Sequence, residues 1–433
     1  MTVRYVHTVG KPILNNSLEK RLLEPWVQSY LYSFYNGFPN GSNFGNDTVI
    51  RVSEKFKTFK ENMLPGEDLM ADSGGYSIIA GDIHPRDIRK FMQCYWEFLT
   101  KYNKYFDTIF SLDIPIFLKY GEMNTKQRIF TYNHESCEGM KKILEAYPEL
   151  YNKFLFVWQW KIPSQFKIWN TLYDEHFKDA KNLHHFAIGG LVSLRSMANL
   201  KFVPYVGPIY KVLKIIMDKN LKKTSIIHLL GQYGRAERFI MAFLDVLFNK
   251  YYLKDKQCDI EIRYDTINYQ LTGLYKVREA IILDLLDDKE NLNQLEDFIP
   301  DEGIRALVVE EIAKIQSGHA LDNPVILGLT YVIYSRYIDD IFAKTIEEYD
   351  LLNFFLSHPN FNQMKNNLEF ILRGVTAKYP LAFKGIGKDI IESFKWILGF
   401  HTAIMDGAST ERIDAGVFKF IEAVNFPYKY VDD

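Results

Sequence analysis

Three aspartates each follow a short segment rich in apolar residues, where a carboxylate can act as an acid, a base or a nucleophile. Asp72, Asp113 and Asp265 follow the runs LMA, TIFSL and DIEIRY. Directly after Asp72 come Ser73, Gly74, Gly75 and Tyr76. Carboxylates that share one site raise each other's pKa, so that one can hold a proton while another attacks as a nucleophile. The sequence therefore predicts this chemistry, provided that the fold brings the aspartates together.

An amide and several glycines end further segments of the same kind. The runs FLFVWQ, HFAIGGL and SIIHLLG close with Gln159, Gly189, Gly190, Leu191, Leu230 and Gly231. Glycine carries no Cβ, so the backbone can turn sharply there and approach a ligand closely. We expect these positions to line the same site as the aspartates.

Each candidate also has a structural interpretation. Asp72 can cap the helix that follows it, and Asp113 can cap a turn before a proline. Gln159, between two tryptophans, can be a satisfied amide in the core. Tyr76 and Leu230 can equally belong to the core.

Strand-like and helix-like segments alternate along the first part of the chain. The expected strands are Val3–Val9, Trp26–Tyr32, Leu69–Ala71, Thr108–Asp113, Phe154–Gln159, His185–Gly190, Ser225–Gly231 and Asp259–Asp265. The expected helices are Pro85–Lys104, Thr125–Tyr147, Pro163–Ala180, Ile209–Asn220 and Arg235–Tyr252. This alternation indicates parallel strands joined by right-handed crossovers. About eight strands favour an α/β fold of the closed (β/α)8 barrel type, also called a TIM barrel. An open doubly wound sheet is the alternative, although a dinucleotide-binding fingerprint is missing.

The pattern changes after the last expected strand. Residues 1–270 are predicted to form the barrel, and residues 271–433 a mainly helical C-terminal region that binds nucleic acid or a partner. Two loops are expected, at Pro39–Asp47 and at Pro204–Pro208, the second of them over the mouth of the barrel.

Composition narrows the class of protein. The chain has 433 residues, of which 47% are hydrophobic, and a formal net charge of −2, so it has no global basic field for nonspecific nucleic-acid binding. Cys94, Cys137 and Cys258 lie far apart, which predicts neither a disulfide framework nor a cysteine zinc site. The chain shows no signal peptide and no apolar run that could span a bilayer. We expect a cytoplasmic protein that does not associate with membranes.

Two further sets of ionisable residues need an interpretation. The basic residues have two possible roles, and a histidine pair is expected to have a structural role. The basic residues form either a phosphate track near the rim or ordinary solvated surface; they include Arg195, Lys201, Lys222, Lys223, Arg235 and Arg238. The pair His184–His185 lacks partners at metal-ligand spacing, so it is expected to mark the start of a strand. No metal ligand and no cofactor are predicted.

The motifs resemble the tRNA-guanine transglycosylase superfamily over roughly residues 1–270. The matching blocks, in the family's order, are ADSGGY with Asp72, SLD with Asp113, Gln159, AIGGL with Gly189 and Gly190, HLLG with Gly231, and YD with Asp265. The chain departs from the family in lacking the zinc-binding CxCxxC after the last of these blocks, because no cysteine follows Cys258. A divergent member without the zinc subdomain is most similar to the DpdA branch, whose members exchange guanine in DNA for a 7-deazaguanine.

The resemblance implies a pentosyltransferase that forms a covalent aspartyl-glycosyl intermediate. It makes Asp265 the nucleophile and Asp72 the general acid and base, with Asp113, Gln159 and Gly190 reading the base. Tyr76 and Leu230 would then enclose the base. The implied partners are nucleic acid, with DNA favoured over tRNA, a 7-deazaguanine base and accessory proteins.

Three other functions remain open from the sequence. The first is a tRNA-guanine transglycosylase that acts on RNA, and the second is a non-catalytic nucleic-acid-binding barrel subunit. The third is a glycosidase or nucleosidase in which water replaces the incoming base.

Overall fold

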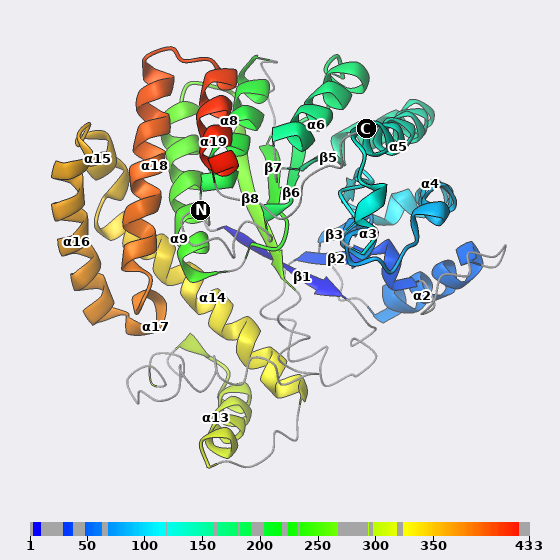
Figure 1. Cartoon of the computed structure of the whole chain (residues 1–433). Helices are drawn as coiled ribbons and strands as arrows, with labels where there is room; N and C mark the ends of the chain where they lie inside the picture. Colours follow the sequence, from blue (N-terminus) through cyan, green and yellow to red (C-terminus); the bar gives the residue numbers. More distant parts are fainter. Residues whose placement is uncertain are drawn as a thin grey trace.

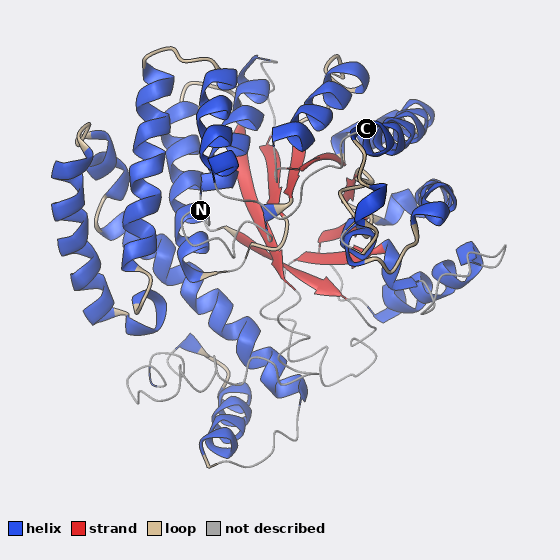
Figure 2. Cartoon of the chain, in the orientation of Figure 1, coloured by secondary structure: helices blue, strands red, loops and turns tan. Residues whose placement is uncertain are grey.

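Eight parallel β-strands close into a barrel in the computed structural model (Figures 1 and 2). The structure describes residues 3–9, 29–37, 48–62, 68–117, 119–159, 163–180, 182–191, 203–218, 224–232, 234–266, 293, 298–317 and 324–423. The strands are β1 Arg4–Val9, β2 Ser29–Ser33, β3 Asp68–Asp72, β4 Thr108–Phe110, β5 Phe154–Gln159, β6 His185–Gly189, β7 Thr224–Leu229 and β8 Asp259–Thr266. Each strand pairs with the next along the chain, and β8 pairs with β1 with Asp265 opposite Val6. The predicted (β/α)8 barrel is therefore confirmed.

The side chains inside the barrel form layers of different polarity along the strands. At the amino ends, Arg4 and Arg263 form ion pairs with Asp68 and Glu261, including a 2.7 Å contact between Arg4 Nε and Glu261 Oε1. Above them lies an apolar layer that consists of Val6, Leu31, Met70, Phe110, Leu155, Val157, Ala187 and Ile226. Side chains alternate between the two faces of a strand, so residues two positions further on face the same interior. Most of those positions hold polar groups or glycine, among them Ser33, Asp72, Gln159, Gly189 and His228; the exceptions are Leu112 and Val157.

Helices cover the outside of the barrel (Figure 2). They are α2 Thr48–Asn62, α3 Gly75–Ala80, α4 Ile88–Tyr102, α5 Lys126–Ala146, α6 Pro163–His176, α8 Val203–Asp218 and α9 Arg235–Leu247. The short 3-10 segments are η2 Phe34–Gly37, η3 Pro85–Asp87, η4 Asn103–Tyr105, η5 Gly121–Met123 and η6 Pro148–Asn152, and a π-helical turn, η7 Phe248–Tyr252, extends α9. Apolar residues at helical spacing bury one face of each long helix against the strands, as α4 does with Phe91, Tyr95 and Phe98.

The C-terminal region is helical over the residues described there. Its helices are α13 Glu302–Gln316, α14 Pro324–Glu348, α15 Leu351–Leu356, α16 Phe361–Lys378, α17 Pro380–Phe383, α18 Gly387–Met405 and α19 Thr410–Ala423. Helices α14 and α18 pack against α9, and α19 packs against α8 (Figure 1). This region therefore shares its apolar core with one side of the barrel.

A buried polar network joins the C-terminal region to strand β8. Arg238 of α9 donates from Nε to Asp339 Oδ1 of α14 at 2.8 Å, and Tyr264 of β8 donates from its hydroxyl to Asp339 Oδ2 at 2.7 Å. Arg238 and Asp339 are both buried. Arg238 therefore belongs neither to a phosphate track nor to the solvated surface, and the two alternatives considered for it are both wrong.

Two further expectations differ from the structure. The loop expected at Pro204–Pro208 is wrong, because α8 begins at Val203 and includes both prolines. Pro204 falls in the first turn, where the amide groups have no partner within the helix, so it costs little there. Pro208 lies inside the helix. Strand β4 ends at Phe110 rather than at Asp113. The Ser111 amide still donates to Leu155 of β5 at 2.8 Å, but Ile114 bonds to α5 in place of a strand, because Asn133 binds both its amide and its carbonyl. The loop expected at Pro39–Asp47 and the basic residues at 195, 201, 222 and 223 lie outside the described residues.

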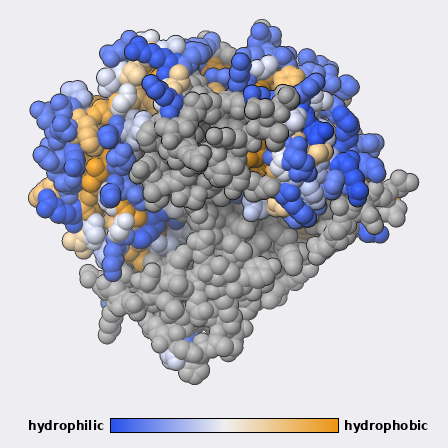
Figure 3. Space-filling model, in the orientation of Figure 1, coloured by the Kyte–Doolittle hydropathy of each residue, from blue (hydrophilic) through white to orange (hydrophobic). Residues whose placement is uncertain are grey.

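The outer surface is polar over most helices. Figure 3 shows hydrophilic residues over the outer helices and apolar residues between them on the side of the C-terminal helices. Among the described helices, none combines the length and the apolar character that crossing a membrane requires.

Candidate functional site at the carboxyl rim of the barrel

The catalytic and base-binding residues expected from the sequence all lie within the described residues, at or just after the carboxyl ends of strands. Asp72, Gln159, Gly189 and Asp265 lie in β3, β5, β6 and β8. Asp113 follows β4 by three residues, and Gly231 follows β7 by two. In (β/α)8 barrels this rim is the one that carries catalytic groups.

Asp265 lies close enough to Asp72 for its charge to affect the pKa of Asp72. The pKa of Asp72 is raised from 3.8 to about 6, mainly by burial, and the negative charge of Asp265 adds to the effect. Hydrogen bonds from Ser33 and from the amide of Gly74, together with the charge of His228, oppose the shift without cancelling it. The amide of Gly74 donates to Asp72 Oδ2 at 3.1 Å. Asp72 does not act as the cap of α3, because Gly74 occupies the cap position.

Asp265 is held by two donors from the end of β7. His228 Nε2 and the amide of Gly231 each lie 3.0 Å from Asp265 Oδ1. A carboxylate only accepts hydrogen bonds, so Nε2 of His228 carries the proton. His228 is fully buried, and its ring lies edge-on against Phe110 with centroids 5.2 Å apart. Two donors on one oxygen fix the orientation of the Asp265 carboxyl group.

Asp113 and Gln159 form the second polar pair of the rim. Gln159 donates from Nε2 to Asp113 Oδ2, and both residues are buried. Gln159 Oε1 is buried and makes no hydrogen bond to any described residue. Such an atom is costly to leave unpaired, so it suggests a ligand or a water molecule at this position. Neither the turn cap proposed for Asp113 nor the satisfied core amide proposed for Gln159 accounts for this arrangement.

Two glycines lie directly against this pair. A Cβ at Gly75 would lie 2.9 Å from Asp113 Oδ1, and a Cβ at Gly189 would lie 2.4 Å from Gln159 Nε2. Both distances are shorter than real Cβ contacts. The glycines therefore let Asp113 and Gln159 reach the rim.

The two pairs of polar residues belong to one site. Tyr95 of α4 donates from its hydroxyl to the carbonyl of Phe110 at 2.7 Å. The pKa of Tyr95 is raised well above its usual value by burial, and the charges of both Asp72 and Asp113 add to this effect. Asp113 and Asp72 therefore both lie near Tyr95, and the charge of Asp265 in turn raises the pKa of Asp72.

The remaining candidates border this site with different exposure. Tyr76, at the start of α3, is 72% exposed, so its interpretation as a core residue is wrong. Leu191 is buried, and Leu230 packs against the apolar layer inside the barrel. Ser73 is buried. The backbone has a positive φ of 79° at Gly190 and 71° at Gly231, which glycine adopts without strain.

His228 is the residue of this site to which the sequence interpretation gave no role. It points into the barrel because Ile226, two residues earlier on β7, belongs to the inner apolar layer. A histidine on the inward face of an otherwise apolar strand is the signal that could have identified it. Tyr264 was also missed, and its contact with Asp339 supports β8 from the outside, one residue before Asp265.

The histidine pair at the start of β6 has a structural role, as expected. His185 contacts the carbonyl of Asn152 through Nε2 at 2.9 Å and accepts from the amide of Ile226 at Nδ1. In the described part of the chain, the rim does not bring three histidine, cysteine or acidic side chains within metal-coordinating distance of one another.

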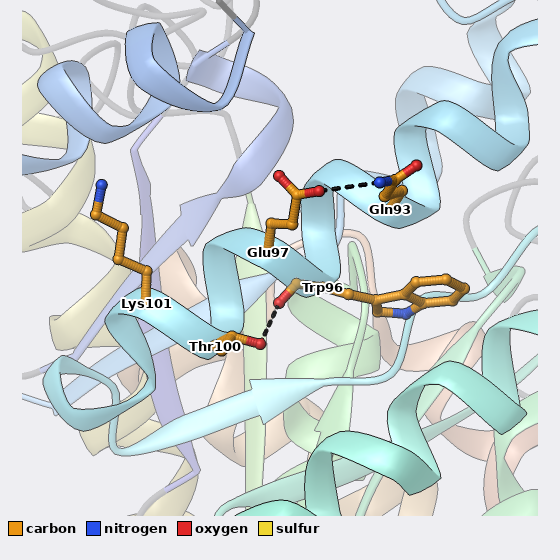
Figure 4. A pocket seen from close by; sticks show the side chains of 5 residues that line it. All are labelled: Gln93, Trp96, Glu97, Thr100 and Lys101. Atoms are coloured by element: carbon orange, nitrogen blue, oxygen red, sulfur yellow. Dashed lines mark hydrogen bonds between the residues drawn. The ribbon is translucent and has the colours of Figure 1, made fainter. Parts of the chain in front are cut away.

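A shallow groove on the outside of α4 lies away from the rim. Figure 4 shows its lining residues, which are Gln93, Trp96, Glu97, Thr100 and Lys101. Gln93 and Glu97 bond to each other at 3.0 Å. This groove lacks the buried carboxylates that distinguish the barrel mouth.

Fold and site together define a (β/α)8 barrel with a cluster of coupled carboxylates at its carboxyl rim. Comparison of the chain with models of known protein families finds no match, and comparison with curated proteins finds none either.

Proposed function

We propose that the protein is a base-exchange transglycosylase of the tRNA-guanine transglycosylase type, which replaces guanine in nucleic acid with a 7-deazaguanine. The observation that carries the proposal is the coupling of Asp72 and Asp265, which lie 193 positions apart in the sequence and share one barrel mouth. Base exchange without net hydrolysis needs two such carboxylates with different tasks.

The surroundings of the two carboxylates suit these tasks. Asp265, oriented by His228 and Gly231, attacks C1′ of the sugar and forms an ester as the bond between C1′ and the base breaks. Asp72, with a pKa raised to about 6, gives its proton to the departing guanine. The ionised Asp72 then takes a proton from the incoming base, whose nitrogen attacks C1′ and releases Asp265. Two displacements at C1′ give net retention.

The second polar pair supplies recognition of the base. Asp113 is a buried acceptor, which suits the N1–H and the exocyclic amine of guanine. Gln159 ends β5, and Gly190 directly follows the end of the neighbouring strand β6, where the amide of each can read O6 and the side of position 7. A base without these donors leaves a buried carboxylate without its partners, and sites of this kind discriminate strongly.

DNA is the favoured nucleic acid in this proposal. The support comes from the sequence, which lacks the zinc-binding motif of the tRNA enzymes and continues into a helical C-terminal region instead. A base in a duplex must first be turned out of the stack, which costs a few kcal/mol.

The test is an exchange assay with radiolabelled guanine. Wild-type protein is incubated with guanine-bearing DNA and, in parallel, with tRNA, and the label lost or gained by each polymer is counted. The proposal expects exchange with DNA and none with an Asp265→Asn variant. Exchange with tRNA alone moves the activity to the RNA branch. Release of free guanine without incorporation identifies a hydrolase and overturns the proposal.

A further inference from the structure

Two helices on the outside of the barrel bring three metal-binding side chains together, with a fourth, Glu138, beside His134. His134 and Glu138 lie one turn apart on α5, and Glu175 and His176 are adjacent at the end of α6. Helices α5 and α6 pack against each other (Figure 1). Ligand atoms of His134, Glu175 and His176 all lie within 4.8 Å of one another.

The two imidazoles are arranged so that both can face one ion. Their rings lie edge to face, with centroids 4.7 Å apart and planes at 72°. His176 Nε2 is buried and makes no hydrogen bond to any residue in the described ranges. Glu138 Oε2 lies 3.9 Å from His134 Nδ1. This distance is too long for a hydrogen bond, but it places the Glu138 carboxylate beside the first of the two imidazoles. A buried imidazole nitrogen without a partner needs a ligand to satisfy it.

The charges around this cluster favour a cation. Burial lowers the pKa of His176, and the neighbouring His134 lowers it further. The carboxylates of Glu175 and Glu138 raise the pKa of His176 and provide negative charge near it. The cation Lys141 acts in the opposite direction and lowers this pKa.

We propose that His134, Glu175 and His176 bind a divalent transition-metal ion between α5 and α6. Two imidazoles and a carboxylate are a donor set that suits Zn²⁺ and leave the fourth position of a tetrahedron to a further ligand. This proposal does not depend on the proposed function of the barrel mouth.

A bound ion would help to hold the segment after β4 that carries Asp113. Asn133, next to His134 on α5, binds the backbone of Ile114, and Ser136 donates to the carbonyl of Leu112 at 2.6 Å. The residues on both sides of Asp113 are therefore held by the same turn of α5 that carries the cluster. Helix α6 follows β5, the strand that ends in Gln159.

The test is binding of Zn²⁺ to the full chain after removal of metals with a chelator. Isothermal titration should give one ion per chain for this site, with weaker binding at pH 5.5 than at pH 7.5 because protons compete for imidazole. His176→Asn and His134→Asn should each weaken binding by at least about tenfold, since even residues that only orient a ligand cost about 10–100-fold. Glu145→Gln, an exposed change on the same helix, is the matched control and should bind as the wild type does. Equal affinity and stoichiometry in both histidine variants would overturn the proposal.

Two further measurements separate loss of the ion from loss of the fold. Circular dichroism should show the same helix content in the variants and the wild type. Zn²⁺ should raise the thermal midpoint of the wild type as its concentration increases, and should leave that of His176→Asn unchanged. A bound Co²⁺ should give the visible absorption of a tetrahedral site in the wild type alone. Equal shifts of the midpoint in wild type and variant would contradict the site.

Discussion

Replacing Asp72 with asparagine is expected to stabilise the fold at alkaline pH and to change little near pH 4. Burial and the charge of Asp265 raise the pKa of Asp72 from 3.8 to about 6. The folded protein therefore keeps a proton at pH values where the unfolded chain has lost it, and wild-type stability falls as the pH rises through this window. Each pH unit is worth about 1.4 kcal/mol, so ionising Asp72 costs the folded state about 3 kcal/mol above pH 6. Asparagine does not ionise, so the variant does not lose this stability as the pH rises.

Urea unfolding at pH 4, 6 and 8 measures the effect. The difference in the free energy of unfolding between Asp72→Asn and wild type should grow from near zero at pH 4 to about 3 kcal/mol at pH 8. Asp255→Asn, at an exposed position, is the control and should stay within about 0.5 kcal/mol at every pH. A variant that is less stable than the wild type at pH 8, or a difference that does not change with pH, would refute the placement of Asp72 in a buried, negatively charged site.

Three further substitutions test the site and its support. His228→Phe removes a donor to Asp265, and a hydrogen bond to a charged group is worth about 1.5–3 kcal/mol, so the rate of base exchange should fall about 10–100-fold with little change in KM for the base. Gly189→Ala places a Cβ 2.4 Å from Gln159 Nε2, which must displace the amide and raise KM for guanine. Asp339→Asn removes the carboxylate partner of the buried Arg238 and should lower the free energy of unfolding by about 3–5 kcal/mol, measured in urea.

Matched changes show whether these effects are specific. His228→Gln keeps an N–H donor and should retain more of the rate than His228→Phe. Gly399→Ala lies in α18, where a Cβ meets no heavy atom within 4 Å; it should stabilise the helix by about 0.5–1 kcal/mol and leave exchange unchanged. Equal losses of activity in Gly399→Ala and Gly189→Ala would show that the second change does not act through Gln159.

The barrel was predictable because its strands and helices carry the two periodicities of apolar residues. The run FLFVWQ at Phe154–Gln159 matches β5 residue for residue, since a short apolar segment between helices has few alternatives. The beginning of α8 was not predictable, because prolines at 204 and 208 usually mark a loop. The end of β4 was missed for another reason: Asn133 replaces a strand as the partner of Ile114, and this contact joins residues far apart in the chain.

The sequence allowed prediction of those site residues that lie at the carboxyl ends of strands. Asp72, Gln159 and Asp265 could be placed at one rim because parallel strands of a barrel end on the same side. The inward position of His228 could be inferred from the pattern of its strand, but its partner could not, since the contact with Asp265 spans 37 positions. The cluster of His134 and His176 was missed in the same way, because its ligands come from two helices without the spacing of a known motif.

The central claim is that Asp265 attacks the sugar, and trapping the covalent intermediate tests it most directly. Wild-type protein and Asp265→Asn are each incubated with labelled guanine-bearing DNA in the absence of an incoming base, denatured and separated on a gel. The account predicts a complex of protein and DNA that survives denaturation in the wild type, maps to the peptide that contains Asp265 by mass spectrometry, and is absent from the variant. A complex that persists in Asp265→Asn, or one that maps to another residue, would contradict it.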